Sequence, residues 1–103
     1  MPIQLSDFRL GWHTYLLLCQ DRSYYCGISS DLRQRLHDHS SGKGSSYTKG
    51  KRPLALVWFE WQPTRQAAAR REKEIKGWGR EKKQRLAAGG VWVSLVRKRA
   101  DSG

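Results

Sequence analysis

Cysteine is scarce in this chain, and its two copies are too far apart for a redox or metal-binding motif. Cys19 and Cys26 lie seven positions apart, so they form neither a CxxC pair nor a disulfide framework. Each falls within a predicted strand, where a free cysteine is usually a buried, reduced core residue. We therefore expect a reducing, cytoplasmic compartment.

Long apolar runs and common catalytic motifs are missing as well. No run approaches the roughly 18 apolar residues of a membrane span, and residues 1–11 carry Asp7 and Arg9 where a signal peptide needs an apolar stretch. We therefore expect no membrane association. The chain also lacks a phosphate-binding P-loop, a Rossmann glycine set, an HExxH motif, a cysteine-rich zinc pattern and a nucleophile elbow.

Acidic residues are few relative to basic ones. Nine Asp and Glu stand against twenty Lys and Arg, which gives a formal charge of +11 and a pI near 10.3. Such a surplus indicates nucleic acid or an anionic membrane as partner. Residues 65–85 alone hold nine Lys or Arg against three Glu, more than solubility requires. We expect this segment to contact phosphates.

The hydrophobic segments are ordered as in a small α+β domain. The expected elements are, in order, strands Trp12–Cys19 and Tyr24–Ser29, a helix capped by Ser30 or Asp31 and running to about Ser40, a mobile basic loop, strand Leu54–Trp61, a helix capped by Thr64 and running to about Trp78, and a short helix 80–88. Periodicity cannot decide whether Val91–Val96 is a strand or a packed extension. We predict one domain over residues 1–103, with a small three-stranded antiparallel sheet flanked by helices in the order β-β-α-β-α. Its core covers about residues 12–86, and residues 87–103 form a C-terminal extension.

Four residues near the start of the chain form a set that suits an anionic phosphodiester. Arg35 and His39 lie four apart on one face of the first helix. Arginine can grip a phosphate with two hydrogen bonds, and histidine can relay a proton near neutral pH. The alternative is a solvated arginine and a half-buried histidine. Tyr15 and Tyr25 are ordinarily packing residues of strands, but nearby positive charge would lower a tyrosine pKa from about 10.

The second long helix carries a carboxylate on its apolar face. Glu72 has Ala68 and Ile75 at four- and three-residue offsets, whereas Glu74 has basic neighbours at those offsets. Burying an unpaired carboxylate is costly, so Glu72 needs a partner. Either a divalent metal or an ion pair with Arg35 or another arginine would satisfy it.

The order of these pieces resembles the GIY-YIG nuclease superfamily, in particular its small standalone bacterial members. His13-Thr14-Tyr15 corresponds to the first family triplet and Tyr25-Cys26-Gly27 to the second. Arg35 stands at the family's arginine position, and His39 stands where the family has Tyr or His. Glu72 matches the metal-binding glutamate.

The resemblance covers about residues 12–86, and the chain departs from the family at two places. His13 and Thr14 replace the Gly and Ile of the first triplet, where they mostly shape the strand. Some family members also use a late asparagine, and this chain contains none. Another polar residue, such as Lys82 or Gln84, would then supply that contact.

The resemblance implies a metal-dependent endonuclease that hydrolyses phosphodiester bonds of nucleic acid, with DNA as the expected form. Glu72 and water would hold one Mg²⁺ or Mn²⁺ ion, which polarises the scissile phosphate. Tyr25 would orient the attacking water or accept its proton, with support from Tyr15. Arg35 would neutralise charge on the phosphate, and His39 would tune or relay the proton.

The remaining site residues are expected to shape the strand or to hold the nucleic-acid backbone. Gly27 is the structural residue. The backbone-binding residues are the basic side chains Arg33, Lys43, Lys49, Lys51, Arg52, Arg70, Arg71, Lys73 and Lys76. Two other functions stay open: a non-catalytic nucleic-acid-binding module on the same fold, and an adaptor whose basic surface meets an acidic protein. The sequence favours no particular oligomeric state.

Overall fold

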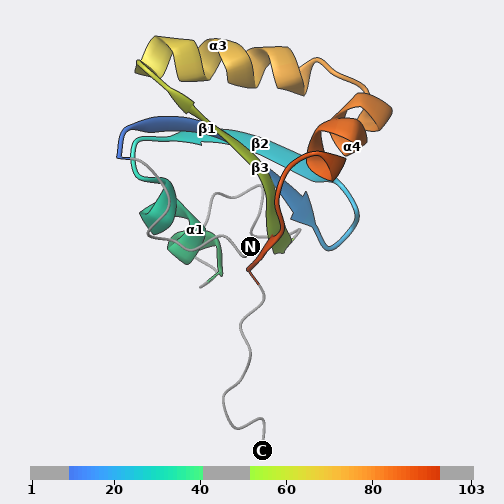
Figure 1. Cartoon of the computed structure of the whole chain (residues 1–103). Helices are drawn as coiled ribbons and strands as arrows, with labels where there is room; N and C mark the ends of the chain where they lie inside the picture. The colour runs from blue at the N-terminus through green and yellow to red at the C-terminus, as the bar shows by residue number, and fades with distance from the viewer. Residues whose placement is uncertain (1–9, 41–51, 96–103) are drawn as a thin grey trace, which may run out of the picture.

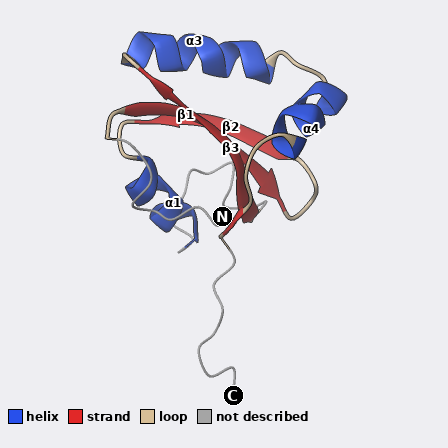
Figure 2. Ribbon diagram, viewed as in Figure 1, coloured by secondary structure: helices blue, strands red, loops and turns tan. Residues whose placement is uncertain are grey.

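The sheet and its helices are seen in the computed structural model, which describes residues 10–40 and 52–95. The elements, labelled as in Figures 1 and 2, are β1 (Trp12–Cys19), β2 (Tyr24–Ser29), α1 (Leu32–Ser40), β3 (Pro53–Gln62), α3 (Arg65–Lys76), α4 (Arg80–Ala88) and β4 (Val93–Ser94). The strands form one antiparallel sheet in the order β2-β1-β3-β4. The predicted α+β class is confirmed. Most of the expected basic loop lies outside the described residues.

The prediction of three strands was wrong, because part of the expected extension adds a fourth strand. Ala55 of β3 lies opposite Ser94 of β4. The Val91 N–H donates to the Val57 carbonyl at 2.9 Å just before this short pairing. Leu95, which follows it, is buried in the core. A two-residue strand is too short for sequence periodicity to reveal.

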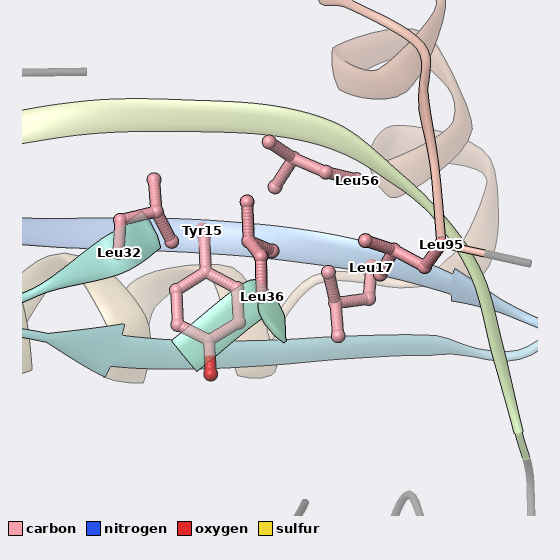
Figure 3. Close-up of a cluster of buried hydrophobic side chains, with 6 residues drawn as sticks. All are labelled: Tyr15, Leu17, Leu32, Leu36, Leu56 and Leu95. Carbon is pink, nitrogen blue, oxygen red and sulfur yellow. The ribbon is translucent and has the colours of Figure 1, made fainter. Parts of the chain in front are cut away.

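β1 lies between β2 and β3 in the sheet, and its side chains alternate between two apolar layers. Tyr15 and Leu17 face α1, while Leu16 and Leu18 face α3. Figure 3 shows the layer on the α1 side, formed by Tyr15, Leu17, Leu32, Leu36, Leu56 and Leu95. The α1 and α3 helices therefore cover opposite faces of one sheet.

The helices begin where their capping residues predict. The Asp31 carboxylate accepts a hydrogen bond from the Gln34 N–H at 3.1 Å, and the Thr64 hydroxyl accepts one from the Ala67 N–H at 3.0 Å. The α3 helix ends at Lys76, slightly earlier than expected. These local hydrogen bonds fix the residue at which α1 and α3 each begin.

A buried hydrogen bond fastens α3 to the central strand. The Thr14 hydroxyl donates to the Ala68 carbonyl at 2.9 Å, across 54 positions of the chain. Cys19 and Cys26 are buried free thiols, as expected. Within the described residues, no helix is both long and apolar enough to cross a membrane.

Gly90 provides a stability test of the connection into β4. A Cβ there would lie 2.1 Å from the Val57 carbonyl oxygen, whereas a Cβ at Gly89 would meet nothing closer than 3.9 Å. Gly90→Ala should therefore lower the free energy of unfolding by about 2 kcal/mol, as overpacking does. Gly89→Ala should change it by less than about 0.5 kcal/mol. Urea unfolding of both variants measures this, and equal effects would contradict the close approach.

Candidate active site

Three ring side chains from three different elements meet on the α1 side of the sheet. Tyr15 comes from β1, Tyr25 from β2 and His39 from the last turn of α1. Their ring centroids are 5.8–6.2 Å apart, and Oη of Tyr15 lies 3.2 Å from Nε2 of His39 in a buried hydrogen bond. Tyr15 is 1 % exposed and His39 is 4 % exposed, while Tyr25 is half-buried. Tyr25 is therefore the member of this ring cluster that is open to solvent.

Gly27 makes room for the ring cluster. It pairs with Tyr15 across the β1–β2 ladder. A Cβ at this position would lie 2.7 Å from the Tyr15 hydroxyl and 3.0 Å from Cε1 of Tyr25. Both rings pack over the bare backbone, so the available space requires glycine here.

Burial sets the protonation of Tyr15. Removal from water raises the pKa of Tyr15 well above 10, and the neighbouring Tyr25 raises it further, against a smaller opposing effect of Arg35. Burial and the neighbouring Tyr25 therefore outweigh the lowering by positive charge, and the pKa of Tyr15 rises where a net lowering was expected. This side chain stays a neutral hydroxyl at physiological pH.

Burial also keeps His39 neutral. It lowers the pKa of His39 from 6.5 to about 4, with a further lowering by the Arg35 guanidinium and a partial offset by Asp38. Arg35 itself is exposed, on the flank of the buried stripe that Leu32, Leu36 and His39 form. A solvated cation thus stands at the edge of a neutral, buried cluster.

Glu72 lies on the other side of the sheet from the ring cluster. It belongs to the inward stripe of α3 with Ala68 and Ile75, and its side chain is 23 % exposed. Its carboxylate pairs with Lys76 at 3.3 Å rather than with an arginine. Burial raises the pKa of the Cys26 thiol to about 12, and the charge of nearby Glu72 adds to this. Glu72 therefore faces the Cys26 side of β2, while Tyr25 occupies the opposite side of the same strand.

The donor set around Glu72 suits a weakly held, hydrated ion. Across residues 10–40 and 52–95, no group of three or more His, Cys, Asp or Glu side chains could enclose a metal. A single carboxylate with hard oxygen donors is nevertheless what Mg²⁺ or Mn²⁺ needs from a protein when water and a phosphate complete its shell. Glu72, half-buried and held by a flexible lysine, meets that requirement.

The predicted backbone-binding residues fall into three groups. Arg33, Arg52, Arg70, Lys73 and Lys76 are exposed, and Lys43, Lys49 and Lys51 lie outside the described residues. Arg71 differs, because its guanidinium lies 5.6 Å from the Trp58 ring and 5.5 Å from the Trp78 ring. It also pairs with Glu60 and Glu74. Sequence reasoning missed this packing, since it joins α3 to a strand residue that no local pattern connects to it.

The neutral state of buried His39 predicts a loss of stability in acid. The unfolded chain binds a proton near pH 6.5, while folded His39 does so only near pH 4. Neutral His39 makes its full contribution to the free energy of unfolding above pH 6.5. The difference in this free energy between wild type and His39→Gln should therefore shrink by about 3 kcal/mol as pH falls to 4. Urea unfolding across that range measures this. His37→Gln, on the exposed side of α1, is the control, and a pH-independent gap would contradict the burial argument.

Comparison with known proteins gives a consistent result. The model of the GIY-YIG catalytic domain matches residues 11–85. A UPF0213 protein of Haloquadratum walsbyi is 46% identical over 82 residues, covering 80% of this chain and 92% of that protein. A UPF0213 protein of Staphylococcus saprophyticus is 40% identical over 78 residues, covering 76% and 95%. The solution NMR structure of a Bacillus halodurans UPF0213 protein is 39% identical, covers 75% of this chain and 82% of that one, and superposes with a TM-score of 0.49.

The family assignment follows from the extent of the domain match and of the two sequence matches. The GIY-YIG domain is that of a nuclease family whose members are generally dependent on divalent metals. The sequence resemblance is thereby confirmed, and this chain belongs to the GIY-YIG catalytic-domain family, with the UPF0213 proteins among its relatives.

Proposed function

We propose that the protein is a divalent-metal-dependent endonuclease that hydrolyses nucleic-acid phosphodiester bonds, with DNA as the expected substrate. The observation that carries this proposal is the ring cluster of Tyr15, Tyr25 and His39 over Gly27, with exposed Arg35 at its edge. The solvated guanidinium stands beside a buried, uncharged imidazole, where a phosphate can reach it. A phosphate bound by Arg35 would lie next to the half-buried Tyr25.

In this proposal the three rings form a path for a proton. Tyr25 orients the attacking water and accepts its proton, while its own hydroxyl proton passes to Tyr15. Tyr15 in turn donates to Nε2 of neutral His39, the 3.2 Å contact in the structure. Burial makes His39 a weak base, and the Arg35 charge weakens it further. A bound phosphate would neutralise that charge and so strengthen His39 as a proton acceptor.

Arg35 and the exposed basic residues would hold the substrate. The Arg35 guanidinium can make two parallel hydrogen bonds to the scissile phosphate and stabilise the charge that grows on it. Arg33, Arg70 and Lys73 would contact neighbouring phosphates of the backbone. Arg71 is assigned no such contact because its guanidinium already packs on Trp58 and pairs with Glu60. The buried free thiols are consistent with a reducing, cytoplasmic setting.

Glu72 would hold the divalent ion of this nuclease. When bound, the ion would supply Lewis-acid chemistry, polarising the phosphate and stabilising the leaving oxygen. Glu72 contributes one hard oxygen ligand from the α3 side of β2. Its neighbour Glu74 is exposed and paired with Arg71, so it is not a candidate ligand.

Exchange of the two glutamates of α3 tests the proposed metal ligand. Glu72→Gln should abolish cleavage in Mg²⁺ or Mn²⁺, a loss of at least about a thousandfold, because the ion loses its protein ligand. Binding of the same DNA without a divalent ion should remain within about threefold, since phosphate contacts carry affinity. Glu74→Gln, on the same helix, should cleave normally. Binding without cleavage by the wild type would instead identify a non-catalytic nucleic-acid-binding module.

The glycine under the rings tests the proton path. In Gly27→Ala the new methyl group must push aside the Tyr15 hydroxyl and the Tyr25 ring, so cleavage should fall by about a hundredfold. Gly77→Ala, where a Cβ would approach no atom closer than 3.5 Å, should cleave at the wild-type rate. Rates measured under single-turnover conditions decide the matter. Full activity of Gly27→Ala would exclude the ring cluster from the chemistry.

A further inference from the structure

The carboxylate of Glu72 lies in basic surroundings. Lys76, one helical turn later, places its ammonium 3.3 Å from the Glu72 carboxylate. The Cys26 thiol on β2 is under the influence of Glu72 and also of Lys76 and Lys83, the latter from α4. Two lysines from two helices therefore share this side of β2 with a single carboxylate.

These charges make the site a poor one for a free dication. A hydrated Mg²⁺ or Mn²⁺ at Glu72 would have to displace the Lys76 ammonium and would then lie close to one or two positive charges. A lone carboxylate offers the ion a single charge and few oxygens in return. A substrate phosphate changes both conditions, because it adds a negative charge and oxygen ligands.

Lys76 is free to change partners. Its side chain is 56 % exposed, and it stands in the last turn of α3, where the carbonyl end of the helix favours a cation. An ion pair at this spacing is worth only a few tenths of a kcal/mol in an exposed helix, so little opposes its release. Its ammonium can leave Glu72 without disturbing the core.

We propose that Lys76 is the resident counter-ion of Glu72, and that it moves from the carboxylate to a nucleic-acid phosphate as the divalent ion binds. Metal and nucleic acid then bind cooperatively, and neither binds tightly alone. The inference rests on the proposed metal site at Glu72 and makes Lys76 a positioning residue. By linkage, the metal must strengthen nucleic-acid binding by the same factor by which nucleic acid strengthens metal binding.

Manganese affinity measures this exchange without reference to turnover. Electron paramagnetic resonance of free Mn²⁺ gives the dissociation constant for the protein alone and with a short DNA duplex, in a Tyr25→Phe background that keeps the DNA intact. DNA by itself serves as the blank. We expect the duplex to tighten Mn²⁺ binding by at least about tenfold. Lys76→Met should bind Mn²⁺ about tenfold more tightly than wild type without DNA, and it should gain less from the duplex.

Lys73→Met is the matched control, since it removes the same charge from the exposed face of the same helix. Its Mn²⁺ affinity without DNA should equal that of the wild type. Equal affinities in Lys76→Met and Lys73→Met, or a wild-type affinity that DNA does not change, would overturn the exchange. Glu72→Gln distinguishes a failure of the proposed metal site from a failure of the proposed Lys76 exchange. If Glu72→Gln with the duplex binds Mn²⁺ as tightly as the wild type does, the assignment of the metal site to Glu72 is wrong. If Glu72→Gln loses Mn²⁺ binding, the metal site stands, and a failure of the Lys76 test concerns Lys76 alone.

Discussion

The arrangement of the molecule depends on the alternation of side chains along β1. This strand is paired on both sides, with β2 and with β3, so its register is fixed twice. Tyr15 therefore points into the α1 layer and meets His39, while Thr14 points into the α3 layer and bonds the Ala68 carbonyl. A slip of one residue would exchange these two side chains and remove both contacts. The register of β1 thus determines both the ring cluster and the hydrogen bond that holds α3 against the sheet.

The same burial that builds the core also sets the chemistry of the ring cluster. Tyr15 and His39 are packed as core residues, and their loss of water keeps both of them uncharged. Arg35 lies close enough to influence both groups and yet remains in solvent. An anion that occupies that guanidinium therefore changes the field at the cluster. A neutral cluster with one exposed cation is suited to respond to a phosphate.

Residue patterns along the sequence correctly predicted the features that depend on neighbouring residues. The bounds of β1 and β2, the caps at Asp31 and Thr64 and the inward position of Glu72 agree with the structure. The fourth strand was missed because its two residues acquire their conformation from β3. The partner of Glu72 was sought among arginines, although Lys76 at the i+4 position satisfies the spacing rule for helix ion pairs. The packing of Arg71 on Trp58 depends on tertiary structure, and no spacing in the chain indicates it.

The edge strand β2 joins the two halves of the proposed site. Consecutive residues of a strand point to opposite faces, so Tyr25 faces α1 while Cys26 faces the α3 side, where Glu72 and Lys76 lie. Because β2 is outermost in the sheet, no further strand covers its free edge within the described residues. A sugar-phosphate backbone that runs along this edge is near both faces at once, whereas one bound over either face alone reaches half of the site. Gly27 in the middle of β2 lets the Tyr15 and Tyr25 rings pack against the strand. The substrate of the proposed nuclease is therefore expected to follow the edge of the sheet.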